Sequence, residues 1–333
     1  MNSPSTTLLP EGRDVPFSDI EAALARLARD GRRRKGSPAR ALTATVVVVG
    51  DRDRLAPAAD ALARLSEAEG VRAILISQGD RTAPTARVTE HAIHIAELAP
   101  RFLDNAIAAL RLSSLPTAVW WRAGSVDSLP EIAWLADRLI LDLEDPSPAW
   151  KAKDVLIERT AVTDLRWTRL TRWRALLAHL FDLPAVRAAA VRRLSIVGSD
   201  PFAARLFAGW LRAALHWGSE VEIELRRSDA VDARTPLQSV ELDCTALQIT
   251  MKTRPGGGCL RADIGGHEAS TRVVPLGEGA LTAVIGEELG VRTRAIAFER
   301  ALAAALEISA SPPDGPSAAS ASSASERWGA TSR

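Results

Sequence analysis

Two hydrophobic patterns alternate along the first half of the chain. Short runs rich in β-branched residues each stop at glycine or polar residues, which is typical of buried strands. The segments between them repeat apolar residues three and four positions apart, the spacing of one helix face. The strand runs are 41–49, 71–77, 116–121 and 139–143, and the helical segments are 57–69, 98–110 and 129–136. Strands that alternate with helices indicate a layered α/β domain with an at least partly parallel sheet.

Further segments complete this first unit. Ser18-Asp19-Ile20-Glu21 has the spacing of a capping box and predicts the start of a helix. Residues 87–95 alternate loosely and predict another strand, at an edge or antiparallel. Residues 150–159 and the stretch from Asp164 predict helices that pack against the sheet. Residues 1–16 are polar, with proline and glycine, and are expected to form a disordered arm.

The second half begins with the same alternation and then becomes richer in strands. Strands are expected at 191–197, 221–225, 239–252, 259–264 and 270–275, and helices at 201–217, 278–289 and 293–306. Glycine-rich turns between the later strands favour antiparallel pairing. From residue 309 to residue 333 serine, alanine, proline and glycine dominate, which predicts a disordered tail.

The expected fold class is therefore α/β, with two α/β units. The first unit, over 17–185, is a Rossmann-like layered sheet with helices. The second unit, over 186–308, is a mixed or antiparallel sheet with helices.

One stretch departs from an ordinary surface helix. Residues 164–181 predict a continuous helix, with Asp164 suited to accept a hydrogen bond from the free amides at its start. At 100° per residue, one broad apolar face gathers Trp167, Leu170, Trp173, Leu177, Leu180 and Phe181. Arg166 and Arg174 fall within that face, and Arg169 and Arg172 flank it. The opposite side carries small residues, so both faces are able to make contacts.

Composition describes a globular protein without a strong electrostatic preference. The 333 residues are 47% hydrophobic and carry a formal net charge of +1, which gives no net attraction to nucleic acid or to an anionic membrane. Neither a signal peptide nor a long apolar run is evident, so a cytoplasmic location is expected. Cys244 and Cys259 could form one disulfide, but two reduced core thiols are favoured.

Tryptophan is unusually frequent, with nine residues against no tyrosine. The central segment holds Trp120, Trp121, Trp134, Trp150, Trp167 and Trp173. Trp and Arg are enriched at interface hot spots. The alternative is that the indoles fill a core.

The common catalytic signatures are missing. The first strand is followed by Gly50 alone, where dinucleotide binding requires three glycines, and a phosphate-binding loop is also absent. Asp142, Glu144 and Asp145 follow a strand, where α/β active sites often lie, although an ordinary loop also explains them. The sequence predicts no catalytic residue, no metal site and no cofactor.

Two motifs resemble a known family. Pro116-Thr117-Ala118-Val119-Trp120-Trp121, followed by Ala136-Asp137-Arg138-Leu139-Ile140-Leu141-Asp142, is similar to the central segment of the glucose-6-phosphate dehydrogenase assembly protein family, OpcA. The stretch Asp164–Arg174 resembles that family's Asp-Leu-x-Trp-Thr-Arg-Leu-Thr-x-Trp-Arg motif. Gly209-Trp210-Leu211 resembles its second unit, and the likeness extends over about 17–306.

The resemblance implies a protein that is not an enzyme. Family members bind glucose-6-phosphate dehydrogenase and promote its active oligomer, which supports the oxidative pentose phosphate pathway. Some cyanobacterial relatives are under redox control through cysteines, but Cys244 and Cys259 match no such motif. The oligomeric state of the chain itself is left open.

The predicted partner-binding or inter-domain residues are the Trp and Arg side chains of the two motifs. They are Trp120, Trp121, Arg166, Trp167, Arg169, Arg172, Trp173 and Arg174. A structural alternative is that Trp167 and Trp173 lock the two units together, with Arg166 and Arg174 paired to carboxylates inside the junction.

Two other functions remain open. One is an enzyme or small-ligand binder for a nucleotide or sugar phosphate, at the strand ends near Gly50, Gln78-Gly79 and Asp142. The other, ranked last because acidic residues balance the basic ones, is nucleic-acid binding through Arg32–Lys35 and the arginine stripe.

Overall fold

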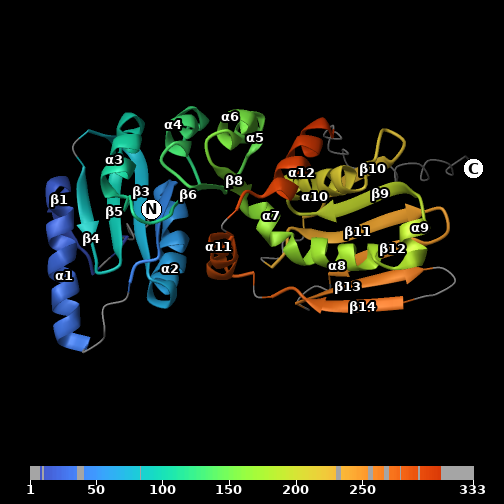
Figure 1. Ribbon diagram of the computed structural model, residues 1–333, viewed down its shortest axis with the longest axis horizontal. Helices are drawn as coiled ribbons and strands as arrows, with labels where there is room; N and C mark the ends of the chain where they lie inside the picture. Colours follow the sequence, from blue (N-terminus) through green and yellow to red (C-terminus); the bar gives the residue numbers. More distant parts are fainter. Residues whose placement is uncertain are drawn as a thin grey trace, which may run out of the picture.

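The computed structural model describes residues 8–9, 11–35, 41–82, 84–229, 234–253, 258–265, 270–277, 279–291 and 293–308, without the side chains of 31–35. The predicted tail at 309–333, most of the predicted arm and the Arg32–Lys35 side chains lie outside this set. Two sheets follow one another along the long axis of the molecule, and helices lie between and upon them (Figure 1). The predicted fold class, two α/β units, is confirmed.

The first sheet has eight strands in the order β1-β4-β5-β3-β2-β6-β7-β8. They are β1 (Arg13–Pro16), β2 (Ala44–Gly50), β3 (Val71–Arg81), β4 (Thr85–Val88), β5 (Ala92–Leu98), β6 (Thr117–Trp121), β7 (Arg138–Leu141) and β8 (Ala161–Asp164). All neighbours from β5 to β8 are parallel, and β1 and β4 add an antiparallel edge. The parallel strands, counted in chain order, lie as 3-2-1-4-5-6, which is the order of a Rossmann sheet.

Helices cover both faces of this sheet. One face packs against α1 (Ile20–Lys35), α3 (Leu103–Leu110), α4 (Leu129–Ala133), α5 (Ser147–Lys151) and α6 (Lys153–Ile157). Short 3-10 turns, η1 (Phe17–Asp19), η2 (Pro100–Phe102) and η3 (Val126–Ser128), lead into three of these helices. The other face packs against α2 (Arg52–Glu69) and α11 (Leu281–Gly290). The helix α11 comes from the C-terminal part of the chain, so the core of the first sheet is completed by the second half of the sequence.

The second sheet has six strands in the order β10-β9-β11-β12-β13-β14. They are β9 (Val191–Gly198), β10 (Glu222–Arg227), β11 (Leu237–Cys244), β12 (Gln248–Thr253), β13 (Cys259–Gly265) and β14 (Ser270–Pro275). The pair β9 and β10 is parallel and the other pairs are antiparallel, so the sheet is mixed as expected.

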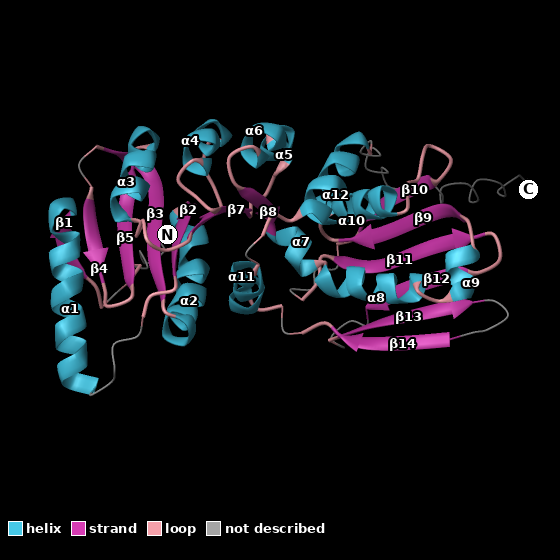
Figure 2. Ribbon diagram, viewed as in Figure 1, coloured by secondary structure: helices cyan, strands magenta, loops and turns pink. Residues whose placement is uncertain are grey.

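Helices gather on one side of the second sheet (Figure 2). The core contains side chains of α8 (Thr171–Phe181), α9 (Pro184–Ala188) and α10 (Pro201–Ala214), and α12 (Ile296–Glu307) packs on α10. Gly209 makes this contact possible, because a Cβ atom there would lie 2.4 Å from the carbonyl oxygen of Ala301. The helix α8 therefore packs with the second sheet, although it precedes the predicted boundary at residue 185. That boundary stays a prediction.

Three predictions for the first unit are corrected. Residues 13–16, expected within a disordered arm, pair with β4 as strand β1. The single strand expected at 87–95 is two strands, with antiparallel β4 separated by a turn from β5, which is parallel and inside the sheet. The helix expected at 57–69 begins at Arg52, with Pro57 inside it. The sequence pattern gave the wrong limits for these elements. The ends of a strand depend on the strands with which it pairs, and the start of a helix depends on the residue at its N-terminus and not on the position of a proline.

Two further predictions are corrected. The single strand expected at 239–252 is the hairpin of β11 and β12. The continuous helix expected at 164–181 is interrupted at Leu170. The first piece is α7 (Leu165–Arg169), which lies between the two sheets, and the second is α8. The apolar repeat continues across Leu170, so periodicity alone does not detect this interruption.

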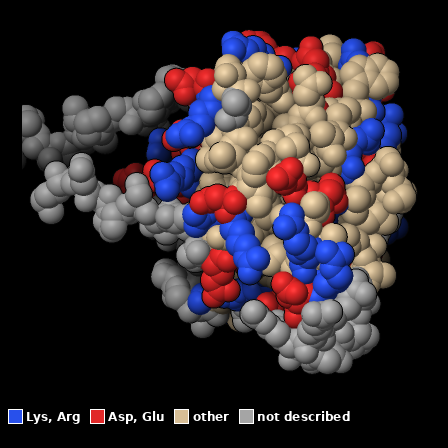
Figure 3. All heavy atoms as spheres, turned by 90° about the vertical axis from the view of Figure 1, so that its left-hand side faces the viewer, with Lys and Arg blue, Asp and Glu red and all other residues tan. Residues whose placement is uncertain are grey.

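Charges of both signs are mixed on the end of the molecule formed by β1 and α1. Basic and acidic side chains lie among each other there, around an uncharged area (Figure 3). None of the helices that the structure describes has the length and apolar composition needed to cross a bilayer.

Candidate functional site

The carboxyl ends of the parallel strands are the place to search for a site. In an open α/β sheet, ligands bind where the strand order reverses, at the carboxyl edge. In this sheet the order reverses between β2 and β6. The residues that follow these two strands, and those that follow β7, therefore define the candidate site.

Arg122, directly after β6, lies in this position. Its Nε donates to Asp142 Oδ2 at 2.8 Å, and its Nη1 donates to the carbonyl oxygen of Arg54. The guanidinium lies 4.8 Å from the ring centroid of Trp120, whose Nε1 donates to the same Asp142 oxygen at 3.2 Å. Burial lowers the pKa of Arg122, and Asp142 opposes that shift. Arg122 is thus a buried, fixed cation.

Arg54 joins the first turn of α2 to the end of β7. Its Nη2 donates to the carbonyl oxygen of Asp142 at 2.6 Å, and its Nη1 donates to Glu144 Oε1 at 3.0 Å. Arg54, Arg122, Asp142 and Glu144 form what we call the switch-point network. It connects α2, β6 and β7 at the edge where a Rossmann protein binds its ligand.

Close contacts at two glycines further restrict the space at the switch point. A Cβ atom on Gly50, at the end of β2, would lie 3.3 Å from Arg122 Cβ. A Cβ atom on Gly124 would lie 2.4 Å from the Oε1 atom of Gln78, and Gly124 has a φ of 122°. Gln78 belongs to β3 and Gly124 follows β6, so their contact passes across the end of β2. Side chains of the protein itself therefore occupy the switch point.

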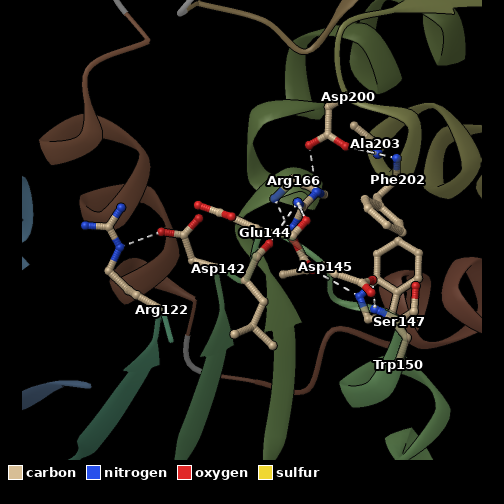
Figure 4. Close-up of polar contacts among 12 residues, drawn as sticks. Arg122, Asp142, Glu144, Asp145, Ser147, Trp150, Arg166, Asp200, Phe202 and Ala203 are labelled. Carbon is tan, nitrogen blue, oxygen red and sulfur yellow. Dashed lines mark hydrogen bonds and ion pairs between the residues drawn. The ribbon is translucent and has the colours of Figure 1, made fainter. Parts of the chain in front are cut away.

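A second polar cluster joins the two units (Figure 4). Asp164 is fully buried, accepts from the Arg166 amide at 2.9 Å as the N-cap of α7, and accepts from Trp150 Nε1 at 3.0 Å. Arg166 Nε donates to Asp200 Oδ2 at 2.7 Å, and Asp200 caps α10 through the amides of Phe202 and Ala203. Burial raises the pKa of Asp164, and Arg166 opposes the shift. We call Asp164, Arg166 and Asp200 the junction network.

Arg166 also reaches the end of β7. Its Nη2 donates to the carbonyl oxygens of Leu143 and Glu144 at 2.9 and 3.1 Å. The junction network therefore adjoins the switch-point network at Glu144. Asp145, the third residue of the acidic cluster, accepts from the amide of Ser147, the first residue of α5, at 2.9 Å. All three carboxylates after β7 have structural partners, which agrees with the loop interpretation of this segment.

A third contact fixes α11 to the first sheet. Glu288 is buried, with Arg138 Nη1 at 2.7 Å and Thr168 Oγ1 at 2.7 Å from its two carboxylate oxygens. Arg138 Nη2 donates to the carbonyl oxygen of Thr293 at 2.6 Å. Burial raises the pKa of Glu288, and the hydroxyl of Thr168 and the charge of Arg138 oppose the shift. One carboxylate thus holds β7, α7 and α11 together.

The four predicted tryptophans are buried. Trp120 and Trp121 are on opposite faces of the first sheet, in two different core clusters. Trp167 packs edge-on against Phe298 of α12, and Trp173 packs against Phe207 of α10. Burial favours the alternative that the indoles fill a core.

The four predicted arginines differ in their surroundings. Arg166 has the carboxylate partners that the structural alternative expected. Arg174 does not have them in the described part of the chain, since its guanidinium lies 3.5 Å from the Trp167 centroid and donates to Trp167 O and Thr171 Oγ1. Burial lowers the pKa of Arg174 to about 10. Arg169 is half-buried and Arg172 is exposed, and partner contact by these two stays a prediction.

Sequence reasoning did not identify Arg54, Arg122, Arg138, Asp200 and Glu288 as members of these networks. A signal exists for two of them. Arg122 directly follows a buried strand, so its side chain begins at the carboxyl edge of the sheet. Glu288 stands three and four positions from Ile285 and Val284 on the buried face of α11, where a lone carboxylate requires a partner.

The two cysteines are free and far from each other in the sheet. Cys244 ends β11, whereas Cys259 begins β13, and these strands run parallel with β12 between them. The thiols therefore lie at opposite ends of the sheet. Burial raises the pKa of Cys244 to about 11, which disfavours the reactive thiolate.

The chain is a two-sheet α/β protein whose Rossmann switch point is filled by its own arginine and carboxylate side chains. Residues 160–302 match the family model that describes the C-terminal domain of a glucose-6-phosphate dehydrogenase subunit.

Curated relatives carry the name "Putative OxPP cycle protein OpcA". The Synechococcus elongatus protein is 25% identical over 206 residues, which are 50% of this chain and 46% of the relative. The Synechocystis protein is 28% identical over 127 residues, which are 34% of this chain and 26% of the relative. The chain is therefore similar to the OpcA proteins, as the motif around Trp167 indicated, and the matches span less than half the length of these relatives.

Solved structures of similar arrangement have low sequence identity. A super-repressor mutant of Gal80p from Saccharomyces cerevisiae is 10% identical, with a TM-score of 0.48 over 80% of this chain and 94% of that one. An oxidoreductase from Sinorhizobium meliloti is 11% identical, with a TM-score of 0.44 over 80% and 86%.

Proposed function

We propose that this chain is a non-catalytic assembly factor that binds glucose-6-phosphate dehydrogenase and promotes its active oligomer. The observation that carries the proposal is the match of residues 160–302 to a domain named for a subunit of that enzyme, together with the OpcA relatives. The proposal includes the support of the oxidative pentose phosphate pathway and the cytoplasmic location expected from the sequence.

The switch-point network supports a role without catalysis. A dinucleotide needs the space beside the turn after the first strand, where backbone amides approach its pyrophosphate. Here Arg122 and Gln78 take that space, and Asp142 and Glu144 are engaged by arginines. A ligand of that kind would first have to separate a buried cation from its carboxylate, which is strongly unfavourable.

The junction network and Glu288 support a rigid scaffold. Arg166 joins the first sheet to α10, and Glu288 joins α11 to β7 and α7. A surface held by two locked units loses little conformational entropy when it binds a partner. An assembly factor shifts an oligomer equilibrium only by its difference in affinity for the two states, and a rigid surface that fits one oligomer gives such a difference.

The test is a titration of the chain into the dehydrogenase of the same organism. Specific activity is expected to rise with chain concentration and to saturate. Activity that stays constant at saturating concentrations would refute the proposal. The chain alone, assayed with glucose 6-phosphate and either nicotinamide dinucleotide, is expected to show no turnover.

A small-ligand binder is the second candidate, and two observations favour it. The strand order is that of a nucleotide-binding sheet, and the Nε2 atom of Gln78, near the switch point, has no hydrogen-bond partner among the described residues. Thermal unfolding with added nucleotides and sugar phosphates separates the candidates. A ligand that binds only the folded chain raises Tm with concentration. The assembly role predicts an unchanged Tm.

A further inference from the structure

Trp134 differs from the other tryptophans that the structure describes. Its exposed fraction is 68%, whereas Trp120, Trp121, Trp150 and Trp173 are at most 1% exposed. It lies at the C-terminal end of α4, within the segment that links the double tryptophan to β7. The hydrophobic core does not require this indole, because the neighbouring Ile132 and Ala133 already bury the apolar side of α4.

The indole has one contact with a charged side chain although it is exposed. The guanidinium of Arg159, after the end of α6, lies 4.5 Å from its ring centroid. An arginine over an aromatic face is a favourable cation–π contact. Val155 of α6 is 44% exposed and adds to the apolar surface of this helix pair. We name Trp134, Val155 and Arg159 the α4–α6 patch.

The composition of the patch is that of an interface hot spot. Trp and Arg are the residue types most enriched among side chains whose removal weakens binding strongly. A large, rigid, amphipathic ring that is already oriented loses little rotamer freedom on contact. An exposed tryptophan without a partner is unfavourable in water, since its apolar surface is hydrated.

The exposed charged residues that neighbour the patch in the sequence are acidic, whereas Arg111, which donates to the carbonyl oxygen of Leu135 at 3.2 Å, and Lys153, which pairs with Asp154, are half-buried. Glu131 and Asp137 each stand three residues from Trp134, and Glu158 precedes Arg159, and all three are exposed. Arg159 is turned toward the ring. A complementary surface would present an apolar pocket for the indole, with lysine or arginine side chains at its rim.

We propose that the α4–α6 patch is the surface through which the chain binds its partner protein, and that Trp134 is the central anchor of the contact. The partner is a protein with an apolar pocket rimmed by basic side chains. This inference rests on the proposed function, which names the dehydrogenase as that protein. It moves the contact away from the buried tryptophans of the two motifs to the one that is exposed.

The test measures binding of the full-length chain to the immobilised dehydrogenase, for wild type and for variants. Trp134→Ala is expected to raise Kd about 30-fold, as substitution of a hot-spot residue does. Val273→Ala is the matched control, because Val273 is 59% exposed on β14 of the second sheet. It should leave Kd unchanged. Both variants should keep the wild-type Tm, since neither side chain is part of a core.

A charge reversal tests the basic rim. Glu158→Lys is expected to weaken binding. The Kd of this variant should depend less on salt concentration than the wild-type Kd does. Asp60→Lys is its control, since Asp60 is exposed on α2, on the opposite face of the first sheet. Equal Kd values for Glu158→Lys and Asp60→Lys would contradict a basic rim.

The outcomes separate this inference from the proposed function. If wild type binds and Trp134→Ala binds equally well, the patch is not the docking surface, and the proposed function stands. If wild type does not bind, both fail. Sedimentation of the free chain tests whether a second copy of the chain binds at the α4–α6 patch instead. A wild-type dimer that becomes monomeric with Trp134→Ala would assign the patch to self-association and overturn the inference.

Discussion

Trp173 lies at the centre of the second core and makes a specific polar contact there. Its Nε1 donates to Thr235 Oγ1 at 2.7 Å, and its ring packs edge-on against Phe207. Trp173→Ala should lower the free energy of unfolding by about 3–5 kcal/mol, as large cavities in cores do. Urea denaturation measures this loss.

A matched pair identifies the role of the motif in which Trp173 stands. Arg172→Ala, at the exposed neighbouring position, should change stability by less than about 0.5 kcal/mol. Trp173→Phe, which removes the indole donor, should lose an intermediate amount. A Trp173→Ala variant of normal stability that no longer activates the dehydrogenase would instead show direct partner contact at this residue.

His94 should make the stability of the first unit depend on pH. Burial lowers its pKa from 6.5 to about 4, and the charges of Arg52 and Arg87 add to the shift. Between these values the unfolded chain binds a proton that the folded chain does not. Stability is therefore full above pH 6.5 and is lost as the pH falls through about 4.

The variant His94→Gln isolates this effect from that of the carboxylates. Between about pH 7.5 and pH 4.5, wild type should lose about 2–3 kcal/mol of unfolding free energy more than His94→Gln. Denaturant unfolding at several pH values gives both curves. Parallel curves would show that His94 titrates equally in the folded and unfolded chain.

At the scale of elements, the contact between α10 and α12 depends on one glycine. A Cβ atom on Gly209 would lie 2.4 Å from Ala301 O and 2.6 Å from Ala305 N, and both belong to the backbone of α12. Gly209→Ala should therefore separate the helices and destabilise the chain by about 1–3 kcal/mol or more. Thermal unfolding measures the change.

Gly290, the last residue of α11, is the control for this substitution. A Cβ atom there meets nothing within 4 Å, so Gly290→Ala should be neutral or slightly stabilising. Similar losses for the two variants would mean that the close approach of α12 does not set the requirement for glycine at position 209.

The elements that local sequence determines were predictable. The β-branched runs before Gly50 and Arg122 are buried strands in their expected places, and Asp164 caps a helix as expected. The interruption at Leu170 was not predictable. It arises where α7 packs between the sheets and α8 packs on the second sheet, and the spacing of apolar residues does not show these packing partners. Strand β1 was also missed, since its pairing with β4 is a long-range contact.

The site was predictable to a smaller extent. The positions of the acidic residues after β7 and of the arginines in the Trp167 motif mark them as unusual in the sequence. Their partners were not, because Arg54, Arg122 and Asp200 come from other strands and helices. Glu288 reaches the first sheet from a helix 120 residues beyond Thr168 in the chain. Such pairs depend on topology and not on spacing.

At the scale of the whole molecule, polar contacts connect the two sheets. Arg166 links the end of β7 to Asp200 at the start of α10. Glu288 pairs with Arg138 of β7 and fixes α11, from the C-terminal part of the sequence, on the first sheet. In the proposed function, the partner surface belongs to a scaffold that keeps this arrangement on binding. This arrangement suits a protein whose effect depends on a difference in affinity between two states of its partner.

The central claim is that the chain promotes the active oligomer of the dehydrogenase. The mass of the particles that form when the two proteins are mixed tests this claim most directly. The dehydrogenase, diluted until its smaller and less active form predominates, is combined with saturating chain, and particle mass and activity are measured on the same sample. We predict a species with the mass of the active oligomer plus bound chain, and activity that rises with its population. Two separate species with the masses of the free proteins, at unchanged activity, would contradict the account.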